Sequence, residues 1–197
     1  MENLFDADGV ALFDDYARVP EPEIDSYTPR KLLTKLRNTA RILAEVNDGE
    51  GPEIALLNEL EFDRTPASGV ADYASFLREY ADTTVEAMLT DGFDAAIAGL
   101  PVDALLLKAL EDRGMTGYEM VIQSARPIDE SVEAHTNAVL SRFPVMEVRN
   151  HPIHDARDIL EVVVEVAGHP FRLFCNHWKS GASDPDREPV RVQNAEV

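Results

Sequence analysis

The sequence has one cysteine, little positive charge and no long apolar run. Cys175 is the single cysteine among 197 residues, which excludes an intrachain disulfide framework and a zinc site built from several cysteines. No stretch approaches the roughly 20 apolar residues that cross a bilayer, and the first 30 residues show neither the basic nor the apolar part of a signal peptide. We therefore expect no transmembrane segment, and a cytoplasmic protein or a secreted one whose leader lies upstream of Met1.

The shortage of positive charge bears on the class of partner. There are 18 Lys and Arg against 37 Asp and Glu, which gives a formal net charge of -19. So acidic a protein repels polyanions, whereas a protein that binds duplex nucleic acid by neutralising phosphates is expected to be basic. Any phosphate-directed function therefore needs a local basic patch or a bound cation. The composition is otherwise that of a globular protein, because 45% of the residues are hydrophobic and 28% are charged.

Helical patterns dominate the first 113 residues. Pro29 directly after Thr28 is typical of a helix start, and apolar residues follow at helical spacing until Asn47. Residues 66–113 also carry apolar stripes at helical spacing, interrupted by glycine and proline. We predict one long helix from Pro29 and a mainly helical segment over 66–113, to which the sequence assigns no substrate.

Short strand candidates fill most of the remaining chain. Residues 53–60 form an apolar run without alternation, which suits a strand buried on both faces. Five further runs in the last third are bounded by turn residues, and residues 167–170 predict a hairpin between the last two. These five runs are residues 118–123, 137–141, 145–149, 159–166 and 171–176. Strands at this density require a sheet with helices on one face, so we predict an α/β protein.

Polar side chains follow two of the predicted strands directly. One apolar run leads into Asn58 and Glu59, and another leads into Asn176 and His177. Because ligand sites in open α/β sheets lie outside strand ends, we expect Glu59 and His177 to share one site. The alternative is that Glu59 is only the first exposed residue after a buried strand.

Two residues after His177 add candidate substrate contacts. Lys179 and Ser180 have the chemistry to bind an oxyanion, whereas Trp178 between His177 and Lys179 is more typical of packing. A zinc site made from His151, His154, His169 and Cys175 is disfavoured, since the spacing of these residues matches no ligand pattern.

Four stretches of the chain resemble motifs of one superfamily. The stretch NHWKS, residues 176–180, resembles the N-H-L/W-x-S motif of the endonuclease/exonuclease/phosphatase superfamily of metal-dependent phosphohydrolases. Three more stretches resemble other motifs of that superfamily in the same order along the chain. They are ENLFD at residues 2–6, PEIALLNELE at 52–61 and TNAVLSRFPV at 136–145.

The resemblance implies a site and roles for its residues. Glu59 takes the position of the principal metal ligand, and Asn3 that of an asparagine that helps to hold the metal, Mg²⁺ or Mn²⁺. His177 would protonate the leaving oxygen or polarise the scissile phosphate, and Asn176 would contact that phosphate. The residue types suit these roles, because hard cations prefer carboxylate and amide oxygens and imidazole titrates near neutrality.

Two motifs of the superfamily, G-D-x-N and S-D-H, do not occur in the sequence. In the superfamily they carry the water-activating Asp, its Asn partner and a second catalytic His. We therefore expect residues 1–197 to be a partial domain, the first half of a four-layer α/β/β/α sandwich. It would be truncated at the C-terminus, would lack part of its first strand and would have little or no activity alone. An exposed sheet edge left by a missing half favours self-association.

The resemblance leaves more than one function open. The intact parent is expected to be a metal-dependent phosphoester hydrolase, a nuclease or phosphodiesterase, with nucleic acid among the candidate substrates. A phosphomonoesterase or lipid phosphodiesterase of the same superfamily is the first alternative, and the negative net charge favours it slightly. The second alternative is a non-catalytic acidic module that binds a basic partner.

Overall fold

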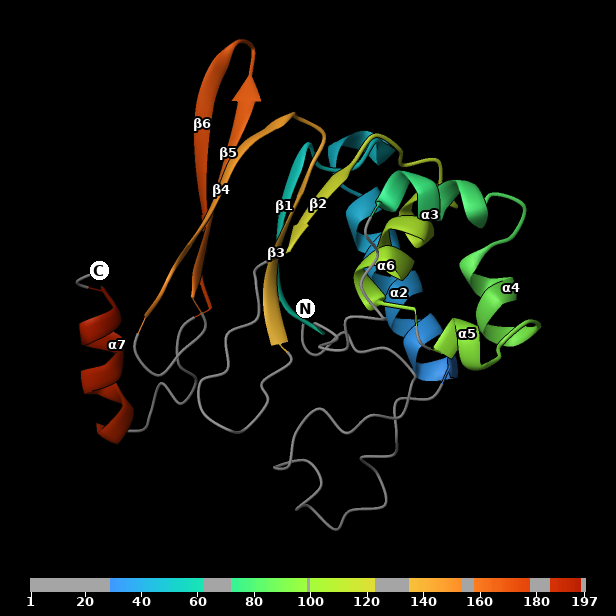
Figure 1. The fold of residues 1–197 in the computed structure, drawn as a ribbon, viewed down its shortest axis with the longest axis horizontal. Helices are drawn as coiled ribbons and strands as arrows, with labels where there is room; N and C mark the ends of the chain where they lie inside the picture. Colours follow the sequence, from blue (N-terminus) through green and yellow to red (C-terminus); the bar gives the residue numbers. More distant parts are fainter. Residues whose placement is uncertain are drawn as a thin grey trace.

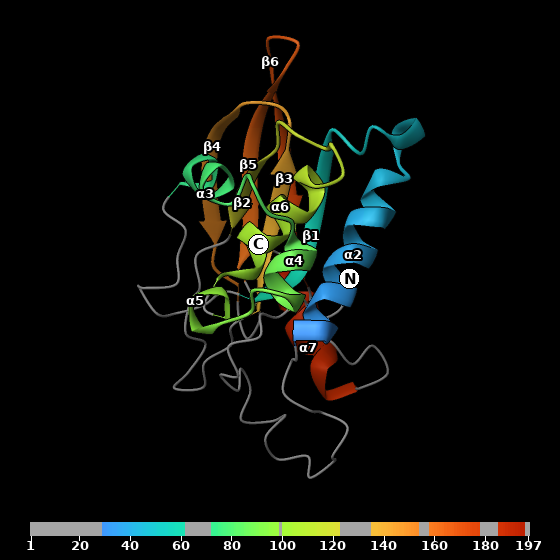
Figure 2. The ribbon, with the colours of Figure 1, turned by 90° about the vertical axis from the view of Figure 1, so that its right-hand side faces the viewer.

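The computed structural model describes residues 29–61, 72–98, 100–122, 135–153, 158–177 and 185–195. Asn3, Lys179 and Ser180 lie outside these residues. Figures 1 and 2 show a group of helices against one sheet and a second sheet on the other side of that sheet. The described helices are α2 (Pro29–Ala44), α3 (Tyr73–Glu79), α4 (Val85–Thr90), α5 (Ala95–Ala98), α6 (Val102–Glu111) and α7 (Glu188–Ala195), with short 3-10 helices η1 (Asn47–Gly49) and η2 (Pro185–Arg187).

The described strands form two antiparallel sheets of three strands each. They are β1 (Ile54–Glu61), β2 (Glu119–Ile122), β3 (His135–Ser141), β4 (Val145–His151), β5 (Ile159–Val166) and β6 (His169–Cys175). Sheet A has the order β1-β3-β2 and sheet B the order β4-β5-β6. The α/β class and all six strand predictions are therefore confirmed. The four-layer sandwich stays a prediction, because the described residues place the helices α2 to α6 on sheet A alone.

The helix α2 confirms the prediction from the periodicity after Pro29. Its buried residues Leu32, Leu33, Leu36 and Ala40 recur three and four positions apart, so they form one apolar face. That face packs on α4 and α6 in the core between the helices and sheet A. Each fully buried leucine contributes about 1.5–3 kcal/mol through the hydrophobic effect. Burial of this face therefore stabilises the packed helix.

The helical segment after residue 72 buries charged groups that are paired within it. Asp103 in the first turn of α6 accepts a hydrogen bond from the hydroxyl of Tyr73 in α3. Burial raises the pKa of both groups. Lys108 is ion-paired with Asp112, whose other carboxylate oxygen accepts a hydrogen bond from the backbone N–H of Val85 at 2.8 Å. These contacts join α6 to α3 and α4.

The strand β1 differs from its prediction in burial. Residues 53–60 do form a strand, and Leu57 and Leu60 are buried toward the helices. Leu56, however, is 47% exposed. The prediction of burial on both faces was wrong, because the side chains of Leu56 and Leu57 point to opposite faces of the strand and only that of Leu57 is buried. Among the described strands, β1 lies at an edge of sheet A. Self-association through this edge stays a prediction.

Sheet B is built around the buried central strand β5. The side chains of Leu160, Val162 and Val164 point toward sheet A and form a second apolar core with Val139 of β3. A tight turn at Ala167 and Gly168 joins β5 to β6, and both residues have positive φ (50° and 79°), as a two-residue hairpin turn requires. The predicted hairpin is thus confirmed. No described helix is both long and apolar enough to cross a membrane.

Candidate active site at two strand ends

Glu59 and His177 come together where the two sheets face each other. Oε1 of Glu59 lies 3.3 Å from Nε2 of His177, and their side chains are 21% and 24% exposed. Glu59 lies near the end of β1 in sheet A, and His177 lies two residues beyond the end of β6 in sheet B. Partial burial keeps the pair in a fixed environment while leaving a face open to solvent. The structure therefore brings the two side chains, one from each sheet, into contact.

A β-bulge sets the direction of Glu59. Asn58 is opposite Asn137 in the register of β1 and β3, and Leu60 is opposite Thr136, so Glu59 is an extra residue on β1. Its φ is 62°, the left-handed region that L residues adopt at a cost of about 1–2 kcal/mol. The bulge turns Leu60 toward the helical core and lets Glu59 project toward sheet B. Strain of this kind gathers at functional sites.

Beneath this pair, polar contacts join the two sheets. Sγ of Cys175 lies 3.3 Å from Oδ1 of Asn58 and 3.6 Å from the backbone oxygen of Leu57. Nδ2 of Asn137 donates to the backbone oxygens of Asp158 at 3.2 Å and Cys175 at 3.4 Å. These contacts connect the residue before Glu59 to the strand that leads to His177. They fix the relative position of the two strand ends.

Cys175 is held as a neutral thiol. Burial raises its pKa to about 11, so the thiolate that acts as a nucleophile or metal ligand is scarce near neutral pH. Among the described residues, no group of three or more histidine, cysteine, aspartate and glutamate side chains could hold a metal ion. The disfavoured zinc site finds no support in that part of the chain, and His154 lies outside it.

Two side-chain oxygen groups, one on Glu59 and one on the residue before His177, suit a hard cation in chemistry. Besides the Glu59 carboxylate, Oδ1 of Asn176 is buried and accepts no hydrogen bond from any described residue. A buried amide oxygen of this kind is satisfied by a donor, a water molecule or a cation. The donor set of one carboxylate and amide oxygen fits part of a magnesium or manganese site. Asn3, the other expected ligand, lies outside the described residues.

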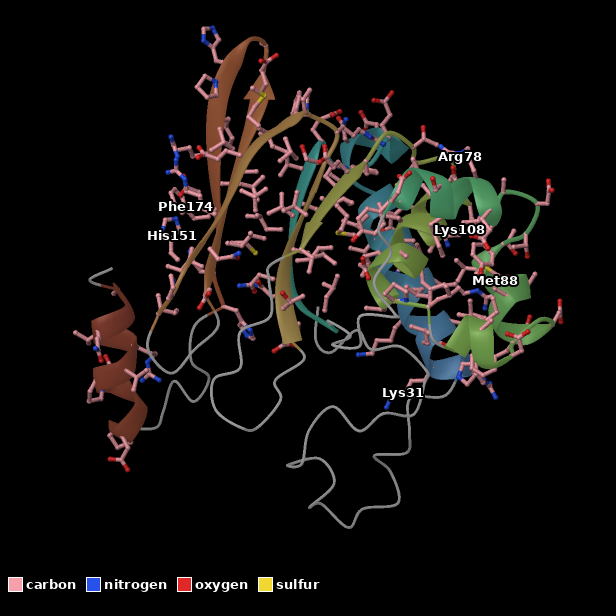
Figure 3. All side chains as sticks on the ribbon, viewed as in Figure 1. Lys31, Arg78, Met88, Lys108, His151 and Phe174 are labelled. Atoms are coloured by element: carbon pink, nitrogen blue, oxygen red, sulfur yellow. The ribbon has the colours of Figure 1, made fainter. Side chains whose placement is uncertain are left out.

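A second Glu–His pair lies on the opposite face of sheet B. Nε2 of His151 in β4 lies 2.6 Å from Oε2 of Glu161 in β5, and Arg172 of β6 is ion-paired with the other oxygen of Glu161. Figure 3 shows His151 beside Phe174 on the face of sheet B turned away from the helices. The hydrogen bond from His151, aided by Arg172, holds the pKa of Glu161 below its usual value although burial opposes this.

A polar hollow lies at the other end of sheet A from Glu59. Its volume is about 390 Å³, and Arg113 and Arg142 line it. Arg142 donates to the backbone oxygens of Glu50 at 2.6 Å and Thr116 at 3.3 Å, and it stacks on the ring of Tyr118. Arg142 therefore ties β3 to the loops before β1 and β2, and its donors are used by the protein itself.

Sequence reasoning overlooked the roles of Asn137 and Cys175 under the site. The sequence predicts Asn137 only as part of a strand, and it gives Cys175 only as a member of a disfavoured zinc site. The signal in the sequence was a polar residue directly before an apolar run, because NAVL in β3 begins with an asparagine. In the structure the exposure of this asparagine is 0%. A buried amide needs partners, but the sequence does not identify carbonyls on the other sheet as those partners.

Comparisons with known proteins show a distant likeness to a solved structure. No family model and no curated protein matches the chain. Among solved structures, the chain is similar to an endonuclease/exonuclease/phosphatase family protein from Leptotrichia buccalis, with 14% sequence identity and a TM-score of 0.50. The match covers 92% of this chain and 58% of the other. At this identity the likeness concerns the fold alone. The chain therefore shares the coarse α/β layout of the Leptotrichia buccalis protein over little more than half of that protein's length.

Proposed function

We propose that this chain carries one half of the active site of a metal-dependent phosphoester hydrolase, a nuclease or phosphodiesterase. The observation that carries the proposal is the 3.3 Å contact between Glu59 and His177, which come from the ends of strands in two facing sheets. The likeness in fold to an endonuclease/exonuclease/phosphatase family protein supports the same reading. Residues that complete the site would come from outside the described part of the chain.

Each residue of the half-site has a role that its surroundings suit. Glu59, aimed by the bulge, would hold Mg²⁺ or Mn²⁺ with Asn3 and would orient the ring of His177. His177 would donate a proton to the leaving oxygen, a task for which imidazole is suited near neutral pH. Asn176, next to it, would contact the phosphate through its amide, with Lys179 and Ser180 as further contacts.

The bound cation has one chemical contribution. It would neutralise a phosphate oxygen and the charge that develops on the leaving group. An anion could then approach a protein whose formal net charge is -19, because the cation is the largest local positive charge.

The test is hydrolysis of bis(4-nitrophenyl) phosphate with Mg²⁺, with Mn²⁺ and with EDTA. We would assay both the 197-residue chain and the longest chain that its coding sequence provides. We expect metal-dependent turnover in the longer chain, and a fall of about 10²–10⁴-fold in kcat on replacing Glu59→Gln. Glu119→Gln, which alters an exposed glutamate of β2, is the matched control and should leave turnover unchanged.

Two outcomes would contradict the proposal. One is a longer chain that hydrolyses neither this diester, nor 4-nitrophenyl phosphate, nor DNA or RNA in the presence of metal. The other is full activity in the Glu59→Gln variant. Hydrolysis of the monoester alone would instead favour the phosphomonoesterase alternative, and hydrolysis of phospholipid vesicles the lipid phosphodiesterase. Absence of all activity together with capture of a basic partner would favour the acidic binding module.

A further inference from the structure

The position of His177 has no support from sheet pairing. Cys175 is the last paired residue of β6 and lies opposite Leu160 of β5. His177 is two residues further along, beyond the ladder of hydrogen bonds that fixes the strand. Contacts made where the chain leaves the sheet therefore bear on the contact of His177 with Glu59.

Asn137 makes the contact at this point. It is fully buried on β3, and its Nδ2 donates to the backbone oxygen of Cys175 at 3.4 Å. This carbonyl belongs to the peptide group that leads directly into Asn176. The same Nδ2 donates to the backbone oxygen of Asp158 at 3.2 Å, where the chain enters β5. One amide in sheet A thus contacts two chain ends of sheet B.

The backbone of Asn137 is paired with the residue that precedes the other member of the Glu59–His177 pair. Asn137 is opposite Asn58 in the register of β3 and β1, directly before the bulge at Glu59. A residue anchored beside Glu59 therefore reaches across to the segment that carries His177. From this arrangement we infer that Asn137 is a positioning residue that holds His177 against Glu59.

The surroundings of Asn137 favour this role over simple packing. The neighbouring inter-sheet core consists of Val139, Leu160, Val162 and other apolar residues. Burying an amide among them costs free energy unless it is hydrogen-bonded, and the net gain from each bond is only about 0.5–1.5 kcal/mol. An apolar side chain would fill the space at less cost. The amide provides a directional contact, which an apolar side chain cannot.

The test uses two variants and a matched control on the same strand. Asn137→Leu keeps the volume and removes the donor, and Asn137→Ser is smaller and leaves room for a water molecule. Ser141→Ala is the control, because Ser141 is also buried on β3 but bonds only locally, to Phe143 at 2.9 and 3.0 Å. All three variants lose polar contacts, but only the Asn137 variants lose the contact with the strand end.

The readout is nuclear Overhauser contact in the 197-residue chain. We expect the cross-peaks between the His177 ring and the Glu59 side chain to be lost in both Asn137 variants and retained in Ser141→Ala. Cross-peaks between the rings of His151 and Phe174, whose centroids are 6.3 Å apart on the far face of sheet B, report whether that sheet stays folded. Retained His177–Glu59 cross-peaks in a folded Asn137 variant would overturn the inference.

If neither variant folds, the unaltered chain decides. There the two side-chain amide protons of Asn137 should exchange slowly and show cross-peaks to the backbone amide of Asn176. Rapid exchange and no such cross-peaks would mean that Asn137 does not hold this segment.

A kinetic arm rests on the proposed function and is separate from the spectroscopic one. In a chain that hydrolyses phosphoesters, Asn137→Leu should lower kcat roughly 10- to 100-fold with KM little changed, because it displaces a catalytic group without removing a substrate contact. Lost cross-peaks with unchanged kcat would leave the positioning role standing and count against the proposed role of His177. Unchanged cross-peaks with reduced kcat would count against the positioning role.

Discussion

Two contacts between glutamate and histidine lie on opposite faces of sheet B, and they are built differently. The inner pair, Glu59 and His177, joins two sheets at strand ends, and both side chains are partly exposed. The outer pair, Glu161 and His151, lies within the regular ladder of one sheet. The side chain of Glu161 is 4% exposed and has Arg172 as a second partner.

The difference shows that the same residue types lie in two different environments. Glu161 has an ordinary strand conformation, hydrogen bonds to His151 and Arg172 and a lowered pKa, so its environment favours the charged form. Glu59 has a left-handed backbone conformation at a bulge, and its contact with His177 is 0.7 Å longer than the outer contact, 3.3 Å against 2.6 Å. An active site needs residues that can exchange partners, and the side chain of Glu59 is 21% exposed whereas that of Glu161 is 4% exposed.

The largest expected difference between the pairs is in catalysis. In a chain that hydrolyses phosphoesters, His177→Gln should lower kcat about 10²–10⁴-fold, the usual contribution of a general acid. His151→Gln should leave kcat unchanged, because His151 lies on the far face of sheet B. Steady-state kinetics with bis(4-nitrophenyl) phosphate measures both. Equal losses of kcat in the two variants would show that the outer pair matters as much for catalysis as the inner pair.

Much of the fold follows from local pattern, and the inner pair does not. The periodicity after Pro29 and the turn residues around 167–170 act through neighbouring residues, so the sequence predicts α2 and the hairpin correctly. The strand at residues 159–166 matches its prediction at both ends for the same reason.

The bulge at Glu59 has no such signal. Positive φ is expected of glycine, asparagine and aspartate, so a glutamate in this conformation is determined by tertiary packing. The polar chemistry at the two strand ends suggested that Glu59 and His177 meet. The side-chain contacts of Asn137 and Cys175 beneath the pair join residues that are 21, 38, 117 and 118 positions apart in the sequence.

The outer pair should contribute more to stability, and in a pH-dependent way. A glutamate whose folded pKa is lowered stabilises the fold above its unfolded pKa, roughly 4.3, and this contribution is lost as the pH falls through the folded pKa. Glu161→Gln should therefore lower the free energy of unfolding at pH 7, and the difference from the unaltered chain should shrink below pH 4. Urea unfolding at several pH values measures this.

Glu165→Gln is the matched control for that experiment, because Glu165 is an exposed residue on the same strand and the same face of sheet B. We expect its effect to be smaller at every pH. A loss of stability for Glu161→Gln that stayed constant from pH 7 to pH 3 would argue that packing, not the charge of Glu161, stabilises the outer face.

The backbone conformation of Glu59 should make glycine more stabilising than alanine at this position, the reverse of the order expected in an ordinary strand. Glu59→Gly should be about 1 kcal/mol more stable than Glu59→Ala, because glycine adopts φ near 62° without the steric cost that a Cβ atom brings. Both variants lack the carboxylate, so their difference isolates the backbone term. At Glu119 of β2, which has no positive φ, glycine should be less stable than alanine. Equal stability of the two Glu59 variants would mean that the bulge relaxes and stores no strain.

The smallest effect concerns Cys175, which lies on β6 under the inner pair while its neighbour Phe174 lies on the outer face. Burial raises the pKa of the thiol to about 11 from roughly 8.5 in the unfolded chain. The resulting stabilisation is complete below pH 8.5 and is lost as the pH rises toward 11. The part that is lost amounts to about 0.8 kcal/mol at pH 9. Cys175→Ala should therefore lose less stability between pH 7 and pH 9 than the unaltered chain does. Urea unfolding at both pH values measures this. Equal losses of stability in the two chains would indicate that the Cys175 thiolate is as well solvated in the folded chain as in the unfolded one.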